Sequence, residues 1–394
     1  MPLSTRTPRA LGCLLGLAIG DALGAPLEGL SAQQIRAHYG TVTGYVDGAI
    51  AWKRKPYRWR MPGLYTDDTQ QALALADVLL EHGRADASRL AEIYLALAHP
   101  KGNYVGAHRG VGRSFRQVLA DLAEGISPKL TGSESAGIGA AMRIAPAAIY
   151  FGNDTEGLFD SVLSASLMTH RDIRSLAGAM AVSCAVRRLM DGESREPSLL
   201  FRVAGDVAKA ENRIAAEFSA TVTSILPHRH AMSSAIARAE RLLDMPRDRA
   251  FAALIEEANR HGAEPSCKRP TMGFPPAIIP TCLFLLIATD SFEEALIEVV
   301  NLGGDADTAG AILGAMAGAH YGASEIPERW LDGLQNRDGV ALRAVALDLR
   351  DTRGIVIPDL IETERRLSRC EDACRDDLLA HRLNGGDLGA NRRI

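Results

Sequence analysis

The chain has 394 residues, of which 47% are hydrophobic but only 5% aromatic, so it can bury a large core and has few residues typical of β-sheets. Its formal net charge of −4 argues against a protein that mainly coats nucleic acid. The six cysteines include no Cys-x-x-Cys pair. Scattered thiols argue against a disulfide framework and predict a reducing, cytoplasmic location.

The N-terminal segment resembles a secretory signal only superficially. Arg6 and Arg9 precede an apolar run that glycines interrupt and that ends at Asp21, short of the ~20 apolar residues of a membrane span. Glycines recur in this run at every fourth position, at Gly12, Gly16, Gly20 and Gly24. Such a stripe lets another helix approach closely, so the sequence predicts a buried central helix and no membrane segment.

Two segments near this helix carry charges with more than one interpretation. Glu28 follows a proline in a loop, where it could reach a metal or substrate or could simply be solvated. Residues 53–60 form a basic run interleaved with aromatic residues. A solvated loop is the simpler interpretation of this run, and contact with an anionic substrate or nucleic acid stays open.

Two short acidic clusters are the most informative features of the chain. Each places two carboxylates and a threonine hydroxyl before an Ala-rich stretch: Thr66, Asp67 and Asp68 in the first, and Asp305, Asp307 and Thr308 in the second. Carboxylates are costly to bury without a compensating cation, and hard oxygen donors suit Mg²⁺, Mn²⁺ or Ca²⁺. Brought together, the clusters could hold two metal ions, although either one alone could merely cap its helix.

Helical signals dominate the rest of the chain. Composition and spacing predict helices over residues 69–80, 136–150, 161–190, 202–225, 233–243, 250–260 and 277–289. Pro280 suits the first turn of the last of these, and Ser291 with Glu294 forms a capping-box pattern for a further helix. An extended stretch over residues 355–361 is disfavoured by Pro358 and charged flanks. The predicted fold class is all-α.

Two segments between the clusters bear on ligand binding. A small-residue loop leads into a predicted helix through Ser135, Ala136, Gly137, Ile138 and Gly139. Backbone N–H groups at such a position can cradle phosphate, although glycine-rich loops usually only connect elements. His170 could contribute to a site, and a hydrogen-bonded structural histidine is the simpler interpretation.

These motifs and their order resemble those of the ADP-ribosylglycohydrolase family, which includes dinitrogenase-reductase-activating glycohydrolases and ADP-ribosyl-arginine hydrolases. The matching segments lie at residues 12–28, 66–69, 139–146, 169–170 and 301–308. The resemblance implies a compact orthogonal bundle of α-helices with two Mg²⁺ or Mn²⁺ ions at the mouth of an ADP-ribose cleft. We expect a catalytic domain over residues 1–325 and a C-terminal helical extension over residues 326–394, packed on the body.

The resemblance also implies roles for individual residues. The implied metal ligands are Thr66, Asp67, Asp68, Asp305, Asp307 and Thr308, and the implied catalytic residues are Asp305 and Glu28. The implied substrate contacts are Glu28, Ser135, Ala136, Gly137, Ile138, Gly139, His170, Gly303, Gly304 and, from a looser alignment, Phe274. Many family members carry Asn in place of Ile138, so only the backbone of this position is expected to act.

The expected function is metal-dependent hydrolysis of the glycosidic bond of ADP-ribosylated substrates, with ADP-ribosyl-arginine on protein as the first candidate. Serine-linked, O-acetyl and nucleic-acid-linked ADP-ribose are the enzymatic alternatives. A non-catalytic ADP-ribose-binding relative should show broken metal motifs, and a dinuclear phosphoesterase should show more histidine ligands. The expected partners are an ADP-ribosylated protein and ADP-ribose; nucleic acid is not favoured, no membrane is expected, and the oligomeric state is left open.

Overall fold

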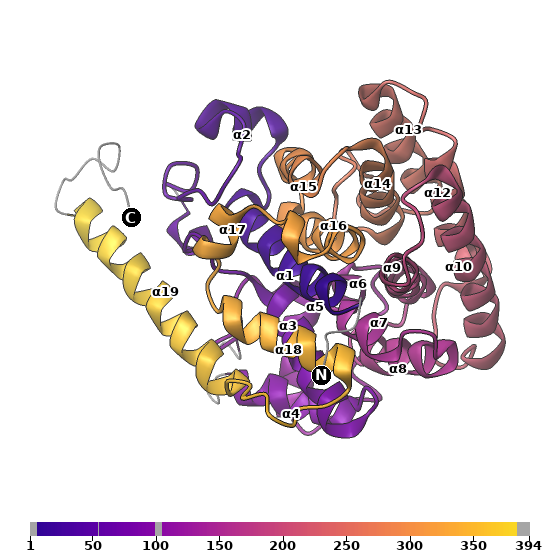
Figure 1. Cartoon of the computed structure of the whole chain (residues 1–394), viewed down its shortest axis with the longest axis horizontal. Helices are drawn as coiled ribbons and strands as arrows, with labels where there is room; N and C mark the ends of the chain where they lie inside the picture. Colours follow the sequence, from indigo (N-terminus) through magenta and orange to yellow (C-terminus); the bar gives the residue numbers. More distant parts are fainter. Residues whose placement is uncertain (1–5, 54, 99–104, 384–394) are drawn as a thin grey trace.

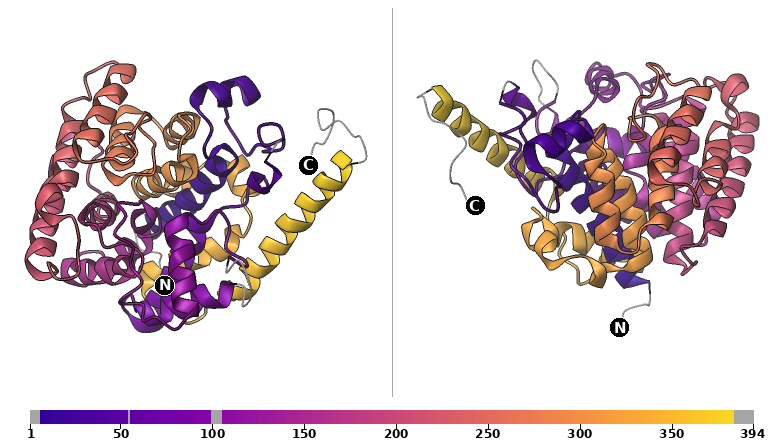
Figure 2. Two further views of the ribbon diagram at one scale, coloured as in Figure 1. Left: turned by 180° about the vertical axis from the view of Figure 1, so that it is seen from behind. Right: turned by 90° about the horizontal axis from the view of Figure 1, so that it is seen from above.

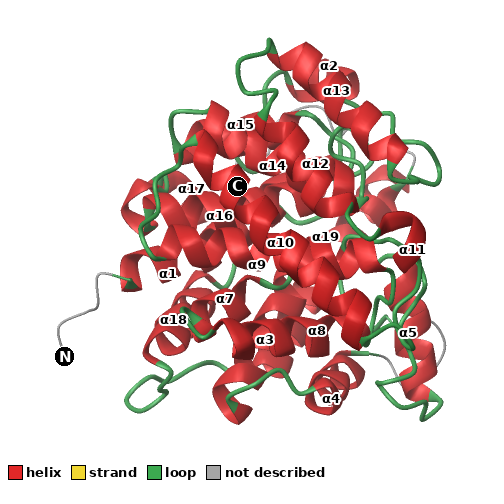
Figure 3. Cartoon of the chain, turned by 90° about the vertical axis from the view of Figure 1, so that its right-hand side faces the viewer, coloured by secondary structure: helices red, strands yellow, loops and turns green. Residues whose placement is uncertain are grey.

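The computed structural model of the chain describes residues 6–53, 55–98 and 105–383 (Figure 1). Within these ranges it consists of helices and loops, with isolated β-bridges and no strand (Figure 3), which confirms the all-α prediction. The helices are α1 (Thr7–Gly24), α2 (Ala32–Tyr39), α3 (Asp67–His82), α4 (Ala87–Leu97), α5 (Arg113–Ala123), α6 (Gly139–Met142), α7 (Ala145–Phe151), α8 (Thr155–Leu167), α9 (Ile173–Met190), α10 (Pro197–Glu217), α11 (Ile225–His228), α12 (Ala231–Glu240), α13 (Arg247–Arg260), α14 (Pro275–Ala288), α15 (Phe292–Asn301), α16 (Ala306–Tyr321), α17 (Glu328–Gly333), α18 (Arg337–Leu349) and α19 (Leu360–Leu383). Short 3₁₀ turns are η1 (Ala25–Leu27), η2 (Pro56–Arg58) and η3 (Ala323–Glu325).

The antiparallel helices α1 and α16 lie side by side at the centre of the molecule, backbone against backbone (Figure 1). A Cβ atom added to successive glycines of α1 would lie only 1.9–2.3 Å from a carbonyl oxygen of α16; the facing pairs are Gly12 with Gly318, Gly16 with Gly314, and Gly20 with Gly310. Only glycine permits this approach. The predicted buried central helix is thus confirmed, and the matching stripe on α16 is its unpredicted partner.

The apolar N-terminal segment is longer than the sequence analysis allowed. By length and hydropathy, Thr7–Leu27 would pass as a membrane span, but 94% of its most apolar window is buried inside the helical bundle. Burial of this kind is expected of the core helix of a globular fold, and the neighbouring helices account for its apolar character.

Several predicted helices have different boundaries in the structure. Residues 136–150 form α6 and α7, because the chain breaks before Pro146, and residues 161–190 form α8 and α9, because the chain turns around His170. The predicted helix over residues 202–225 is α10, which ends at Glu217. Pro280 lies inside α14 instead of its first turn, which begins at Pro275.

Capping of α15 is only half of the predicted box. Ser291 Oγ accepts a hydrogen bond from Glu294 N at 3.0 Å, but the Glu294 carboxylate accepts one from Asp290 N instead of Ser291 N. A complete capping box occurs instead at α2, where Ser31 and Gln34 hydrogen-bond each other reciprocally. The spacing therefore located the start of α15 correctly, while the reciprocal bond shifted by one residue.

The C-terminal part of the chain packs against the body. Helix α18 lies against α1, α3 and α7, and Trp330 of α17 is buried. Helix α19 runs along one edge of the molecule (Figure 2), and its inward face buries Glu364, Leu367 and Glu371. Residues of α17 and α18 belong to the same hydrophobic core as the preceding helices. The domain boundary expected at residue 325 stays a prediction.

Candidate active site

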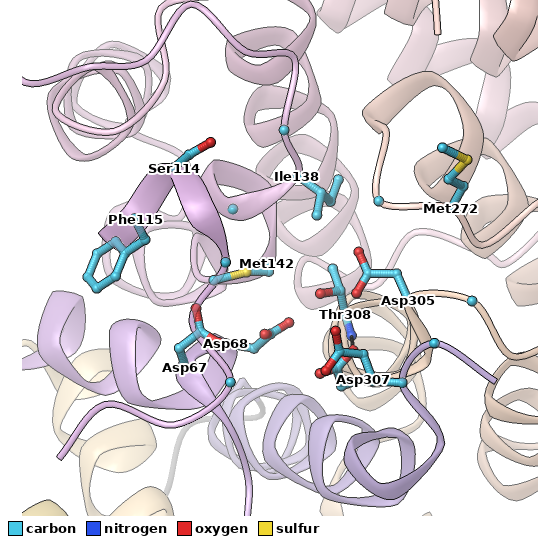
Figure 4. Close-up of a pocket in the computed structure, with 18 of the residues that line it drawn as sticks. Asp67, Asp68, Ser114, Phe115, Ile138, Met142, Met272, Asp305, Asp307 and Thr308 are labelled. Carbon is cyan, nitrogen blue, oxygen red and sulfur yellow. Dashed lines mark hydrogen bonds between the residues drawn. The ribbon is translucent and has the colours of Figure 1, made fainter. Parts of the chain in front are cut away.

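The two acidic clusters face one another across a cleft of about 640 Å³ (Figure 4). Asp67 and Asp68 lie in the first turn of α3, while Asp305 is at the N-cap position of α16 and Asp307 lies in the first turn of that helix. The N-terminus of a helix carries partial positive charge, which favours carboxylates there. Two helix N-termini therefore present four carboxylates to one space.

Asp21 of α1 fixes the position of the first cluster. Its buried carboxylate accepts hydrogen bonds from Thr66 N at 2.9 Å, Thr66 Oγ1 at 2.9 Å, Thr69 N at 3.0 Å and Thr69 Oγ1 at 2.6 Å. These bonds satisfy the start of α3 and occupy the hydroxyl of Thr66. Asp21 was not among the predicted site residues, although an aspartate inside an apolar, glycine-striped helix is a signal that it has a specific partner.

The second cluster is tied to the loop that follows α1. Gly29 N donates to Gly304 O at 2.6 Å, and Gly304 N donates to Leu30 O at 2.8 Å. Gly304 adopts φ +75°, a conformation that glycine tolerates best, and a Cβ there would lie 2.7 Å from a backbone oxygen. This pairing brings the half-buried Glu28 to the wall of the cleft, beside Asp305.

All four carboxylates are costly to ionise in this cleft. Burial, together with charges from Asp21 and Glu28, raises the pKa of Asp67 to about 8. Burial, with the charge of Glu28, raises the pKa of Asp305 to about 6. Burial is also the main cause that raises the pKa of Asp68 and that of Asp307 well above their ordinary values. A bound cation would relieve this cost, because it favours the charged form of each group.

An unpartnered oxygen supports a cation site at this place. Asp68 Oδ1 is buried and has no hydrogen-bond partner in the described part of the chain, while Asp68 Oδ2 is 3.3 Å from Thr66 Oγ1. Among the described residues, no group of three or more Asp, Glu, His or Cys side chains is placed so that it could hold a metal ion as it stands. Mg²⁺ typically binds one or two carboxylates and keeps several waters, so the facing carboxylates and the Thr308 hydroxyl fit such an ion.

The opposite wall is formed by the loop before α6 and by His170. Ser175 Oγ donates to the carbonyl oxygens of Gly137 at 2.8 Å and Ser135 at 3.3 Å, which ties the loop to α9. A Cβ on Gly137 would lie 2.8 Å from His170 Nε2, and one on Gly139 would lie 2.9 Å from its Cε1. Burial lowers the pKa of His170 to about 3, so the ring that lies against Gly137 and Gly139 is neutral.

A chain of hydrogen bonds links the two walls. Gln71 Nε2 donates to Asp67 Oδ2 at 2.9 Å, and Arg143 Nη1 donates to Gln71 Oε1 at 2.5 Å. Arg143 Nη2 donates to Thr169 Oγ1 at 2.5 Å, and this hydroxyl lies 2.8 Å from His170 Nδ1. Gln71 and Arg143 were not among the predicted site residues, although a polar residue one turn after Asp67 faces the same side of α3.

The structure brings most of the predicted site residues together. Those that line the cleft are Glu28, Asp67, Asp68, Gly137, Ile138, Gly139, His170, Gly304, Asp305, Asp307 and Thr308. Those outside its lining are Thr66, Ser135, Ala136, Gly303 and Phe274. The Phe274 ring contacts the Arg174 guanidinium, whose carbon lies 5.5 Å from the ring centroid. Residues 53–60 reach the cleft through Arg58, whose Nη1 donates to Glu28 O at 3.3 Å.

The structure is an all-α bundle with an acid-lined cleft, and comparison with known proteins identifies its family. The model of the ADP-ribosylglycohydrolase family matches residues 2–355. The chain therefore belongs to the ADP-ribosylglycohydrolase family and is a hydrolase of that type. This confirms the family and the fold that the sequence motifs indicated.

Relatives and a solved structure agree with this membership. The chain is 30% identical over 330 residues to the ADP-ribosyl-[dinitrogen reductase] glycohydrolase of Rhodospirillum rubrum, covering 83% of this chain and 90% of the relative. It is 29% identical to an ADP-ribosylarginine hydrolase of Serratia proteamaculans, covering 86% and 79%. It is 27% identical to the ADP-ribosylhydrolase ARH3 of Homo sapiens, covering 86% and 92%. A solved ADP-ribosylglycohydrolase-related protein complex contains a chain with TM-score 0.63 and 29% identity, covering 88% of this chain and 99% of that one.

Proposed function

We propose that this hydrolase uses two divalent cations, Mg²⁺ or Mn²⁺, to release ADP-ribose from ADP-ribosyl-arginine on protein. Support for the arginine linkage comes from the names of two relatives, an ADP-ribosyl-[dinitrogen reductase] glycohydrolase and an ADP-ribosylarginine hydrolase. The observation that carries the proposal is the buried Oδ1 of Asp68, which has no hydrogen-bond partner among the described residues and lies opposite the second acidic cluster. A buried carboxylate oxygen needs a partner, and a divalent cation can be that partner.

The proposed ligands are Asp67, Asp68, Asp305, Asp307 and Thr308, which line the cleft together. Thr66 is a less direct candidate, since its hydroxyl is engaged by Asp21 at 2.9 Å. When bound, the cations would supply positive charge for the ribose hydroxyls and would lower the pKa of water.

The remaining chemistry falls to side chains of the cleft. Hydrolysis forms a bond between a water oxygen and the anomeric carbon of ribose and breaks the bond from that carbon to the guanidine nitrogen. In this proposal the Asp305 carboxylate accepts the proton of the water, and Glu28 holds or protonates the departing guanidine. Both residues line the cleft, and the charge of Glu28 contributes to the raised pKa of Asp305. Carboxylates also stabilise the oxocarbenium character of the transition state.

The loop of residues 135–139 is the proposed diphosphate site. Ser175 holds the carbonyl oxygen of Gly137, and the C=O and N–H of a trans peptide point in opposite directions. The N–H of Ile138 therefore points away from α9. Since Gly137, Ile138 and Gly139 line the cleft, their backbone is positioned to donate to an anionic oxygen whatever the side chain at position 138.

Purified protein should be tested against a matched panel of arginine-linked, serine-linked, O-acetyl and nucleic-acid-linked ADP-ribose. We expect release of ADP-ribose from the arginine conjugate, and loss of release after exhaustive EDTA treatment. Turnover of the serine conjugate with none of the arginine conjugate would refute the linkage, and full activity without metal would refute the cation requirement.

Variants at Glu28 test its role within the same assay. Glu28→Gln should depress turnover while leaving ADP-ribose affinity within about tenfold, a difference of ~1.4 kcal/mol. Glu134→Gln is the matched control, because Glu134 is exposed and lies outside the cleft lining. Equal turnover in the wild type and Glu28→Gln would refute the proposed role of Glu28.

A further inference from the structure

Helix α19 places a buried carboxylate directly behind the first acidic cluster. Glu364 is fully buried and accepts hydrogen bonds from Tyr65 Oη at 2.5 Å, Gln70 Nε2 at 2.8 Å and Arg109 Nη2 at 2.6 Å. Arg109 also donates through Nε to Tyr65 O at 2.9 Å and through Nη1 to Ser368 Oγ at 2.9 Å. The Glu364 side chain of α19 thus connects three segments of the chain through hydrogen bonds: α19 itself, residues 65–70 and Arg109.

The partners of Glu364 enclose the proposed metal ligands from both directions along the chain. Tyr65 directly precedes Thr66, and Gln70 follows Asp68 by two residues. Arg109 belongs to a third segment, whose next residue is Gly110. A Cβ on Gly110 would lie 3.1 Å from Asp67 Oδ1, so the backbone beside Arg109 abuts the carboxylate itself.

A second acid of α19 holds the segment that leads into the cluster. Glu371 is buried two turns after Glu364, and its Oε1 accepts a hydrogen bond from Met61 N at 3.2 Å. Its Oε2 pairs with Arg60 Nη1 at 3.7 Å. The same helix face therefore anchors the chain at residues 60–61, at residue 65 and at residue 70.

This helix lies beyond the part of the chain that the family model matches. The match ends at residue 355, and α19 begins at Leu360. A buried ion pair is often no more stabilising than apolar residues of the same volume, so stability alone is a weak reason for Glu364 and Arg109. Their common feature is contact with residues that flank or abut Asp67 and Asp68.

We propose that Glu364 is a positioning residue, through which α19 holds Asp67 and Asp68 in the geometry that binds the cation. The inference rests on the proposed function, because it assumes that the acidic clusters bind Mg²⁺ or Mn²⁺. Groups that orient metal ligands without touching the metal affect its affinity strongly. Loss of the Glu364 contacts should therefore weaken metal binding while the acidic clusters themselves stay intact.

The test uses Glu364→Gln in the full chain, with MgCl₂ and MnCl₂ titrated by calorimetry in the absence of substrate. We expect the metal Kd to rise by about tenfold or more, as is typical for residues that orient metal ligands. Because the ligands remain, excess metal should restore kcat for the arginine conjugate. Asp376→Asn is the matched control, since Asp376 is exposed on the same helix. The metal Kd of this variant should equal that of the wild type.

Tyr65→Phe is the second variant, and it tests the positioning role of Glu364 if Glu364→Gln does not fold. It removes the hydroxyl that donates to Glu364 and should raise the metal Kd in the same direction. Folded variants with lower thermal stability and an unchanged metal Kd would overturn the inference, because the network would then be structural only. Failure of the wild type to bind either metal would refute the proposed cation centre itself, before any variant is compared.

Discussion

Replacing Asp68 with asparagine should make the metal-free protein more stable. Asp68 is buried, and burial together with the charges of Asp21 and Asp67 raises its pKa. Its Oδ1 has no hydrogen-bond partner in the described part of the chain. Asp68→Asn keeps the shape of the side chain, removes the charge and supplies an amide that can donate to the neighbouring carboxylates.

The expected size of this effect follows from burial and chain length. An unsatisfied buried polar group costs about 1–3 kcal/mol. At ~2.1 cal/mol/K per residue, unfolding of 394 residues carries an entropy of about 0.8 kcal/mol/K, so the Tm without metal should rise by about 1–4 °C. Metal at ~1,000 times its Kd stabilises the wild type by about 4.1 kcal/mol, or about 5 °C, and Asp68→Asn should lose most of this gain.

Thermal melts with EDTA and with saturating Mg²⁺ measure both effects in one experiment. The order of the two Tm values should reverse, with Asp68→Asn higher in EDTA and the wild type higher in Mg²⁺. Asp172→Asn is the matched control, because Asp172 is equally buried but accepts bonds from Arg174 N, Nε and Nη2. Its Tm should fall in both buffers. A lower Tm for Asp68→Asn in EDTA would refute the electrostatic reasoning.

Three further predictions concern the helix pair, the loop and a distant acid. Gly314→Ala should lower the free energy of unfolding by about 3 kcal/mol, because its Cβ would lie 2.0 Å from a carbonyl oxygen of α1. Gly205→Ala is the control for this substitution: its Cβ would meet no described atom within 4 Å, so it should raise that free energy by about 0.5–1 kcal/mol in the same urea titration. Gly137→Val should weaken ADP-ribose binding more than Mg²⁺ binding in calorimetry, because the new side chain meets the His170 ring, and equal losses would indicate a folding defect instead. Burial raises the pKa of Glu211 from 4.5 to about 7, so between these pH values the folded state binds a proton that the unfolded state does not. The free energy of unfolding should therefore fall by up to about 3 kcal/mol as the pH rises from 4.5 to 7. In denaturant melts, Glu211→Gln should show a weaker dependence of this free energy on pH than the wild type.

The features that could be predicted from the sequence depend on the spacing of residues that are close together in the chain. Glycines at every fourth position identified α1 as a buried helix, and α3 (Asp67–His82) contains the helix predicted over residues 69–80. The acidic clusters were recognised as a pair because each stands at the start of a helix. Their meeting across the cleft followed from family resemblance, since no local pattern fixes the distance between residues about 240 positions apart.

The missed features depend on contacts between distant segments. Asp21 meets Thr66 from 45 residues away, and Glu364 meets Tyr65 from 299 residues away. Neither residue has a neighbour in sequence that reveals its partner. The role of Phe274 in substrate binding stays a prediction, and its ring lies against Arg174.

The direct contact of α1 with α16 also determines which parts of the cleft can move. Because no side chains separate these backbones, neither helix can slide or rotate against the other without a collision of main-chain atoms. The end of α1 that leads to Glu28 and the start of α16 at Asp305 therefore form one rigid side of the cleft. Much of the remaining lining lies in or beside connecting segments, at residues 110–115, 137–139 and 265–273, and we expect any opening that admits a bulky substrate to come from these.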